Sequence, residues 1–165
     1  MPLHDLTGAP ASMEIVEFEP CHAEAFKILN EAWISKYFAI EAKDREVLGD
    51  PQGKIVVAGG RIFMAFKDGE AVGCVALIPM EDGGYEVAKM TVLETLRGSG
   101  LGRMLMQRCI DAGAEMGARR LYLETNSSLA PALGLYRAMG FTDIGPPARN
   151  DYARGDTWME RVYPA

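Results

Sequence analysis

The segment Arg97-Gly98-Ser99-Gly100-Leu101-Gly102 separates two different patterns of apolar residues. Before it the period is two, and residues 85–92 are predicted to form a strand. After it, apolar residues recur every three or four positions, which predicts one buried face of a helix. That face consists of Leu101, Leu105, Cys109, Ala112 and Met116. The glycine-rich turn therefore joins the end of a strand to the first turn of a helix.

This turn has the chemistry of a phosphate-binding cradle. The first N–H groups of a helix lack a partner inside the helix and carry partial positive charge. Glycine lacks the β-carbon that would keep a phosphate away, and Arg97 and Arg103 flank the turn with positive charge. We therefore predict a pyrophosphate site, although a purely structural turn has a similar composition. The nucleotide P-loop pattern GxxxxGK[ST] is absent, and the dinucleotide pattern GxGxxG would need glycine at Arg103.

Periodicity also predicts the elements upstream of the turn. These are a strand, a helical region and a meander of three strands, covering residues 14–19, 21–38, 61–66, 71–78 and 85–92. The segment Lys67-Asp68-Gly69-Glu70 has the Asp-Gly signal of a tight hairpin. A short helical or loop region contains Glu41 and Asp44, and the breakers Gly49-Asp50-Pro51-Gln52-Gly53 end it.

Downstream of the predicted helix, residues 121–125 form a short strand. The order strand, helix, strand implies a right-handed parallel crossover from residues 85–92. Start signals at Asn126-Ser127-Ser128 predict another helix, which ends at Gly140. Closing strands are expected at residues 141–144 and 157–163. The predicted fold class is α+β, with an antiparallel meander that leads into one parallel βαβ unit.

Composition limits the class of protein. The chain has 165 residues and a net charge of −6, from 17 basic and 23 acidic side chains. We expect a loose tail over residues 1–13 and a single domain over residues 14–165. An acidic domain is a poor nucleic-acid binder. No apolar run approaches the roughly 18 residues of a membrane span. The cysteines and histidines form no disulfide or metal pattern, which favours a cytoplasmic protein without a metal; they are Cys21, Cys74, Cys109, His4 and His22.

The turn and its neighbours resemble the GNAT superfamily of acetyl-CoA-dependent N-acetyltransferases. The phosphate motif of that family is [QR]-x-x-G-x-[GA], and Arg97, Gly100 and Gly102 match it. The segment Leu133-Gly134-Leu135-Tyr136-Arg137-Ala138-Met139-Gly140-Phe141 resembles the family's LYxxxGF segment. The close match covers residues 84–145. The resemblance implies the GNAT fold, which is a mixed, mostly antiparallel sheet with splayed central strands.

What the resemblance implies about the cofactor can be placed residue by residue. Acetyl-CoA, as co-substrate, would lie between strands 86–92 and 121–125. Backbone groups near residue 91 would pair with pantetheine, backbone N–H groups of the turn would hold the pyrophosphate, and Arg137 would reach the distal phosphates. Asn126 would lie near the thioester. The expected contacts are Met90, Thr91, Val92, Arg97, Gly98, Ser99, Gly100, Leu101, Gly102, Asn126 and Arg137.

Two residues are candidates for proton transfer. Tyr136 resembles the family's tyrosine acid and would protonate the departing thiolate. Its spacing also fits an apolar helix face with Leu135 and Met139. Glu86 is the candidate base, acting directly or through a water, and burial would raise its basicity. It is also compatible with a solvated strand residue that only attracts a cationic substrate. A cysteine nucleophile is the competing mechanism, but neither Cys74 nor Cys109 has a histidine partner in sequence.

The acceptor is predicted to be the primary amine of a small molecule, attacked directly in a ternary complex. Trp33 and Tyr37 would provide an apolar wall and Glu41 would attract the cation, although aromatic core and solvated acids are the alternatives. The other residues considered for this region are Glu31, Phe38, Asp44, Tyr152, Arg154 and Trp158. A protein acetyltransferase and a non-catalytic acyl-CoA-binding module remain open. GNAT relatives often dimerise through their late strands, so the resemblance also leaves a homodimer open.

Overall fold

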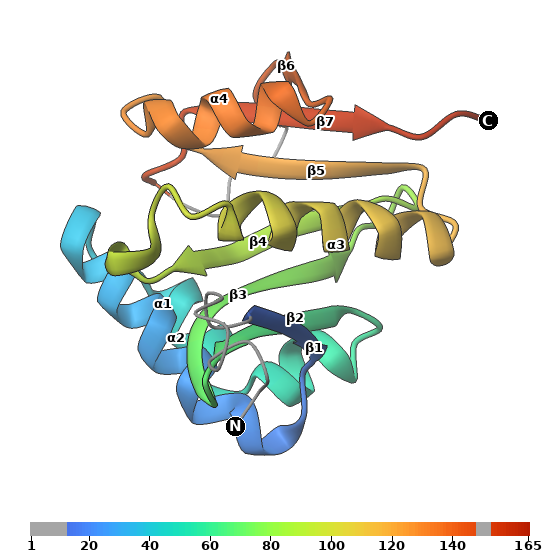
Figure 1. Ribbon diagram of the computed structural model, residues 1–165. Helices are drawn as coiled ribbons and strands as arrows, with labels where there is room; N and C mark the ends of the chain where they lie inside the picture. The colour runs from blue at the N-terminus through green and yellow to red at the C-terminus, as the bar shows by residue number, and fades with distance from the viewer. Residues whose placement is uncertain (1–12, 148–152) are drawn as a thin grey trace, which may run out of the picture.

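The computed structural model describes residues 13–147 and 153–165, and in them a seven-stranded sheet carries helices on both faces (Figure 1). The strands are β1 (Met13–Glu17), β2 (Arg61–Lys67), β3 (Glu70–Pro79), β4 (Tyr85–Val92), β5 (Arg120–Thr125), β6 (Thr142–Ile144) and β7 (Thr157–Val162). The α-helices are α1 (Ala23–Tyr37), α2 (Ala42–Gly49), α3 (Leu101–Glu115) and α4 (Ala130–Ala138). Short helical turns η2 (Pro20–His22), η3 (Gln52–Val56) and η4 (Glu94–Leu96) complete the described elements.

The strand order is β1-β2-β3-β4-β5-β7-β6, and the pair formed by β4 and β5 is parallel whereas the others are antiparallel. The expected hairpin joins β2 to β3. Asp68 and Gly69 both have positive φ there, at 52° and 80°, as a type I′ turn requires. The antiparallel meander and the single parallel crossover confirm the predicted fold class.

The two central parallel strands separate soon after they begin. Their register contains two pairs, Tyr85 with Leu121 and Glu86 with Tyr122, and no further pairing is present in the described chain. From Arg120 to Thr125, β5 instead pairs along its whole length with β7. The C-terminal half of β4 and that of β5 therefore diverge, which opens a wedge between them (Figure 1).

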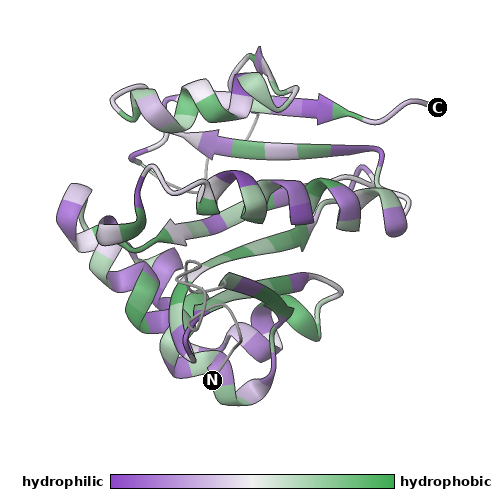
Figure 2. Ribbon diagram, viewed as in Figure 1, coloured by the Kyte–Doolittle hydropathy of each residue, from purple (hydrophilic) through white to green (hydrophobic). Residues whose placement is uncertain are grey.

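Two apolar cores hold the helices on the sheet. On one face, α3 and α4 pack on β2 to β5 and β7 through residues such as Leu105, Leu121 and Met159. On the other face, α1, α2 and η3 pack on β2 and β3 around Phe26 and Ile62. Hydrophobic colours accordingly follow β2 and β3, while β4 and α3 carry both kinds (Figure 2). A sheet buried on both faces requires such apolar central strands.

The breakers at residues 49–53 behave differently from the prediction. They end α2, but the chain re-enters helical structure at once in η3, which is a π-helix with Ile55 fully buried. The Asp50 carboxylate accepts the Gly53 N–H at 3.0 Å, so a side chain satisfies a donor at the start of the new turn. At the N-terminal side, β1 begins at Met13, one residue before the predicted domain boundary. No helix in the described chain has the length and apolar character to cross a membrane.

The buried face of α3 provides a test of the fold. Leu105 is fully buried between α3 and the sheet, so Leu105→Ala should lower the free energy of unfolding by about 2–5 kcal/mol. The adjacent Met104 is 39% exposed, and Met104→Ala should change that free energy by less than about 0.5 kcal/mol. Urea denaturation of both variants measures the difference. Equal effects at the two positions would contradict the packing.

Candidate active site

A cavity of about 500 Å³ occupies the wedge between β4 and β5. Its walls come from the end of α1, from β4, from the glycine-rich turn, from β5 and from α4. Many of the predicted site residues meet there. They are Trp33, Tyr37, Glu86, Met90, Val92, Arg97, Gly98, Gly100, Leu101, Gly102, Asn126 and Tyr136.

The glycine-rich turn presents backbone donors at one end of this cavity. Gly98 and Gly100 have φ of 79° and 91°, which other L-residues rarely adopt, and no atom lies within 4 Å of a Cβ built on either. Within the described chain, no hydrogen bond occupies the N–H groups of Gly98, Gly100 and Gly102. The N–H of Ser99 donates to the Leu96 carbonyl, and that of Leu101 donates to Ser99 Oγ. The available donors are therefore those of the three glycines.

An aromatic group from the end of α1 faces this turn across the cavity. Trp33 stands between Tyr37 and Phe38, with ring centroids 5.3 and 5.9 Å apart. The Arg97 guanidinium lies over the Tyr37 ring, 5.1 Å from its centroid. This contact is favourable because the face of an aromatic ring carries partial negative charge. The arginine of the motif is therefore held at the cavity edge by α1.

Tyr136 lies on α4, against Phe141 at a centroid distance of 6.2 Å. Its ring packs on the apolar core and the residue also lines the cavity, so its position is compatible with a packing role and with the predicted acid role. Its hydroxyl has no hydrogen-bond partner in the described part of the chain. Burial raises the pKa of Tyr136 to about 12. The phenol is therefore protonated throughout the neutral range and able to donate.

Glu86 lies where the first cavity adjoins a second cavity of about 540 Å³. The second cavity is on the face of the sheet covered by α2 and η3, with Val47 and Ile55 in its wall. Glu86, Ala88 and Glu124 line both cavities. These three residues come from β4 and β5 at the point where the two strands diverge. The two cavities therefore share part of their walls, and Glu86 belongs to that shared part.

A β-bulge interrupts β4 in the cavity wall. Ala88 pairs with Ala76 and Thr91 with Cys74, so Lys89 and Met90 both stand opposite the single residue Val75. Lys89 has a φ of 55°. A left-handed non-glycine residue costs of order 1–3 kcal/mol and persists only where its surroundings hold it. Bulges redirect the backbone and side chains of a strand, and this one lies beside the cavity.

Several predicted site residues have other partners. Thr91 is buried on the far side of β4, where its hydroxyl donates to Asn30 Oδ1 at 3.0 Å. Arg137 does not line the cavity and forms an exposed ion pair with Asp143 at 3.0 Å, so its contact with the distal phosphates stays a prediction. Glu41 does not line the cavity either, because its carboxylate accepts from Arg154 and from the Ala153 N–H.

Asn126 lies at the cavity, but its amide is engaged in the chain itself. It donates to the Arg154 carbonyl at 2.6 Å and accepts the Ser128 N–H at 2.9 Å. Of the other residues considered, Arg154 lines the first cavity, Trp158 lines neither cavity, and Tyr152 falls outside the described residues.

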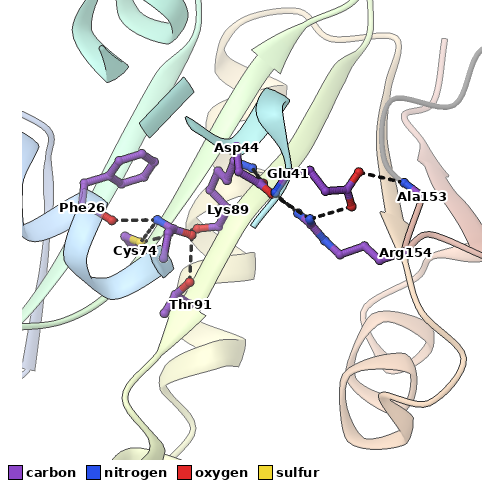
Figure 3. Close-up of polar contacts among 9 residues, drawn as sticks. Phe26, Glu41, Asp44, Cys74, Lys89, Thr91, Ala153 and Arg154 are labelled. Carbon is purple, nitrogen blue, oxygen red and sulfur yellow. Dashed lines mark hydrogen bonds and ion pairs between the residues drawn. The ribbon is translucent and has the colours of Figure 1, made fainter. Parts of the chain in front are cut away.

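The sequence did not single out a polar cluster beside the bulge (Figure 3). Lys89 and Arg154 both bind the carboxylate of Asp44, whose side chain is fully buried. Burial alone would raise the pKa of Asp44, but hydrogen bonds from Arg154 and Lys89 hold it well below its usual range. Burial lowers the pKa of Lys89, in spite of Asp44. The neighbouring Arg154 cation adds to the lowering of the Lys89 pKa, although burial is its main cause. A lysine between the apolar residues of a predicted strand, Val87-Ala88-Lys89-Met90, was the available signal.

Glu124 is a second residue that the sequence did not single out. It lines both cavities, and a Cβ at Gly155 would overlap its carboxylate. The segment before β7 therefore packs on this side chain. In the described ranges, no group of three or more His, Cys, Asp or Glu residues is arranged to hold a metal ion.

Comparison with known proteins agrees with this geometry. The model of the Acetyltransferase (GNAT) family matches residues 19–141. The chain therefore belongs to the GNAT acetyltransferase family, whose members use acetyl-CoA. It is 41% identical over 87 residues to an IAA acetyltransferase of Azospirillum brasilense, which covers 52% of this chain and 57% of that protein. The chain thus spans little more than half the length of this relative.

Two solved structures share the fold. A GNAT family acetyltransferase of Staphylococcus aureus superposes with a TM-score of 0.83 at 20% identity, over 92% of this chain and 99% of that one. The PaiA N-acetyltransferase of Thermoplasma acidophilum, in complex with coenzyme A, superposes with a TM-score of 0.74 at 17% identity, again over 92% and 99% of the two chains.

The cysteines allow a test of the competing covalent mechanism. Cys74 and Cys109 are fully buried, and burial raises the pKa of each thiol to about 12. At pH 8 only roughly one in 10,000 of such thiols is ionised, and the thiolate is the nucleophile. Ellman's reagent should therefore label one cysteine, the exposed Cys21, in the native protein and all three in guanidinium. Rapid native labelling of Cys74 or Cys109 would reopen the covalent mechanism.

Proposed function

We propose that the protein transfers an acetyl group from acetyl-CoA to the primary amine of a small molecule by direct attack in a ternary complex. The observation that carries the proposal is the wedge between β4 and β5, with unoccupied glycine N–H donors at one end and the Tyr136 hydroxyl in its wall. A family member with a phosphate cradle and a protonated acid in one cavity has the groups that thioester aminolysis needs.

The cradle fits the pyrophosphate of coenzyme A. Gly98, Gly100 and Gly102 offer N–H groups at the N-terminus of α3, and side chains leave open space at the first two. Arg97 adds a positive charge at the same edge. The backbone of Met90 and Val92 would pair with the amides of the pantetheine arm, as the resemblance implies. The bound cofactor supplies the activated acyl group, and the chain orients it.

Tyr136 is proposed as the acid that protonates the departing thiolate. A phenol whose pKa is raised to about 12 keeps its proton as the pH rises through 10, so the donor persists across the working range. Its hydroxyl has no competing partner in the described residues. The ring is held by Phe141 and the core, which fixes the position of the phenolic oxygen while the hydroxyl hydrogen can rotate toward an acceptor.

Glu86 is proposed as the base for the acceptor amine. An alkylammonium has a pKa near ~10, so it must lose a proton before attack. Glu86 lies at the junction of the two cavities, beside the wedge. The acceptor would enter by the second cavity, whose size of about 540 Å³ is that of a small-molecule site rather than an extended peptide groove.

The three free cysteines support a reducing, cytoplasmic setting.

The transfer itself is tested by an amine panel. Purified protein is incubated with acetyl-CoA and a set of small amines, amino acids and lysine peptides, and CoA release is followed with a thiol reagent in excess. Turnover with a small amine, and acetylation of that amine by mass spectrometry, is the expected result. Turnover with peptides alone would favour a protein acetyltransferase. CoA binding without any turnover would favour a binding module.

Replacing Tyr136 by phenylalanine tests the acid. Tyr136→Phe removes the proton donor but keeps the ring, so kcat should fall by about 100-fold or more. The dissociation constant for CoA, measured by calorimetry, should change less than about twofold, because the pyrophosphate cradle is untouched. Tyr163→Phe is the matched control. Tyr163 also has a pKa raised to about 12, but its hydroxyl donates to the Ile110 carbonyl away from both cavities. An unchanged kcat for Tyr136→Phe would exclude the acid role.

A further inference from the structure

The bulge in β4 is surrounded by polar contacts from three elements (Figure 3). The Lys89 carbonyl accepts from the Cys74 thiol of β3 at 3.4 Å. On the next residue but one, the Thr91 hydroxyl donates to Asn30 of α1. The Lys89 ammonium extends to α2, where it lies 2.7 Å from Asp44 Oδ1. The strained residue is thus held by its main chain on one side and by its side chain on the other.

Asp44 is itself rigidly placed. As the third residue of α2, it accepts the Glu41 N–H at 2.9 Å in a capping box. Arg154 makes two further hydrogen bonds to it, at 2.8 and 2.9 Å. Its side chain is 0% exposed and that of Lys89 is 5% exposed. A carboxylate that accepts four hydrogen bonds in a buried site has little freedom to move.

Two cations and two carboxylates meet in this cluster. Lys89 and Arg154 contribute the positive charges, and Asp44 and Glu41 contribute the negative charges. Removing one partner of such a buried cluster leaves another without its counter-charge. Asp44 is the hydrogen-bonded counter-ion of the Lys89 ammonium, and the Glu86 carboxylate also acts on it electrostatically. Because Lys89 has left-handed backbone, its pairing with Asp44 acts on the conformation of β4 in the cavity wall.

We propose that Asp44 is a positioning residue for the acetyl transfer. By pairing with Lys89 it holds the bulge of β4 in the conformation that turns the backbone of Lys89 and Met90 toward the wedge, where the thioester would lie. This inference rests on the proposed function. It adds Asp44, a residue that lines neither cavity and acts through Lys89. Arg154 extends the same anchor to the segment before β7, so one carboxylate ties three parts of the cavity wall together.

Replacing Lys89 by glycine tests the left-handed backbone at this position separately from the ion pair with Asp44. Glycine adopts positive φ without strain, so Lys89→Gly should keep the bulge without the ion pair and retain at least one third of the wild-type kcat. Lys89→Met keeps a long apolar side chain but loses the pair, and its kcat should fall at least 10-fold. Asp44→Asn should also lower kcat at least 10-fold in the wild-type background, with the KM for acetyl-CoA within twofold. In the Lys89→Gly background the same change should cost less than threefold.

Glu46→Gln is the control. It removes a carboxylate from the same helix, where Glu46 pairs with Lys54 on the surface, and kcat should not change. Equal losses for Lys89→Gly and Lys89→Met, or a wild-type kcat for Asp44→Asn, would overturn the proposal.

A second readout needs no turnover. Hydrogen exchange of the Lys89, Met90 and Thr91 amides should accelerate at least 10-fold in Asp44→Asn and stay unchanged in Glu46→Gln. Unchanged exchange in Asp44→Asn overturns the positioning role even if no amine is acetylated. If the wild-type protein acetylates no amine, the proposed function is refuted. If exchange is still accelerated in Asp44→Asn, Asp44 is an anchor of the bulge, but its role as a positioning residue for acetyl transfer is refuted too.

Discussion

The separation of β4 from β5 is the constraint on which the rest of the architecture depends. Parallel strands normally continue their ladder, because unpaired backbone groups inside a sheet are costly. Here β5 turns its other edge to β7 for its full length, while β4 bulges at Lys89 and departs. The two strands must then be supported separately. The core under α3 holds them at one end, and the cluster around Asp44 holds β4 at the other.

The two kinds of support differ in what they specify. Apolar packing on both faces provides the stability of the sheet, but it tolerates small shifts of one strand on another. The polar contacts around the bulge are directional and at least partly buried, so they allow fewer arrangements. In the proposed reaction the thioester lies against that part of β4. Precision is therefore concentrated where the backbone departs from the regular ladder, and the rest of the strand is held by ordinary packing.

The sequence predicted the elements that depend on local pattern. The face of α3, the Asp68-Gly69 hairpin and the strand over residues 85–92 follow from periodicity and turn chemistry, and the structure confirms them. It also placed a glycine-rich turn before α3, since glycine spacing is a local property, and the phosphate-binding role of that turn stays a prediction. What it could not give were partners set by tertiary contacts. Glu41 and Arg137 were predicted to bind ligands through their charges. In the structure Glu41 accepts a hydrogen bond from Arg154, which is distant in sequence, and Arg137 pairs with Asp143 of β6. The left-handed backbone of Lys89 also has no local signal.

The sharing of Glu86 by two adjoining cavities has a consequence for how this protein diversifies. The glycine-rich turn and α4 line the first cavity, and α2 and η3 line the second. The helices α3 and α4 belong to one apolar core, whereas α2 and η3 belong to the other, on the opposite face of the sheet. In the proposed reaction, mutations that reshape the second cavity would change the acceptor while the glycine-rich turn keeps its hold on acetyl-CoA. Such a division would let selection explore new acceptors while the acetyl-donor site is inherited unchanged.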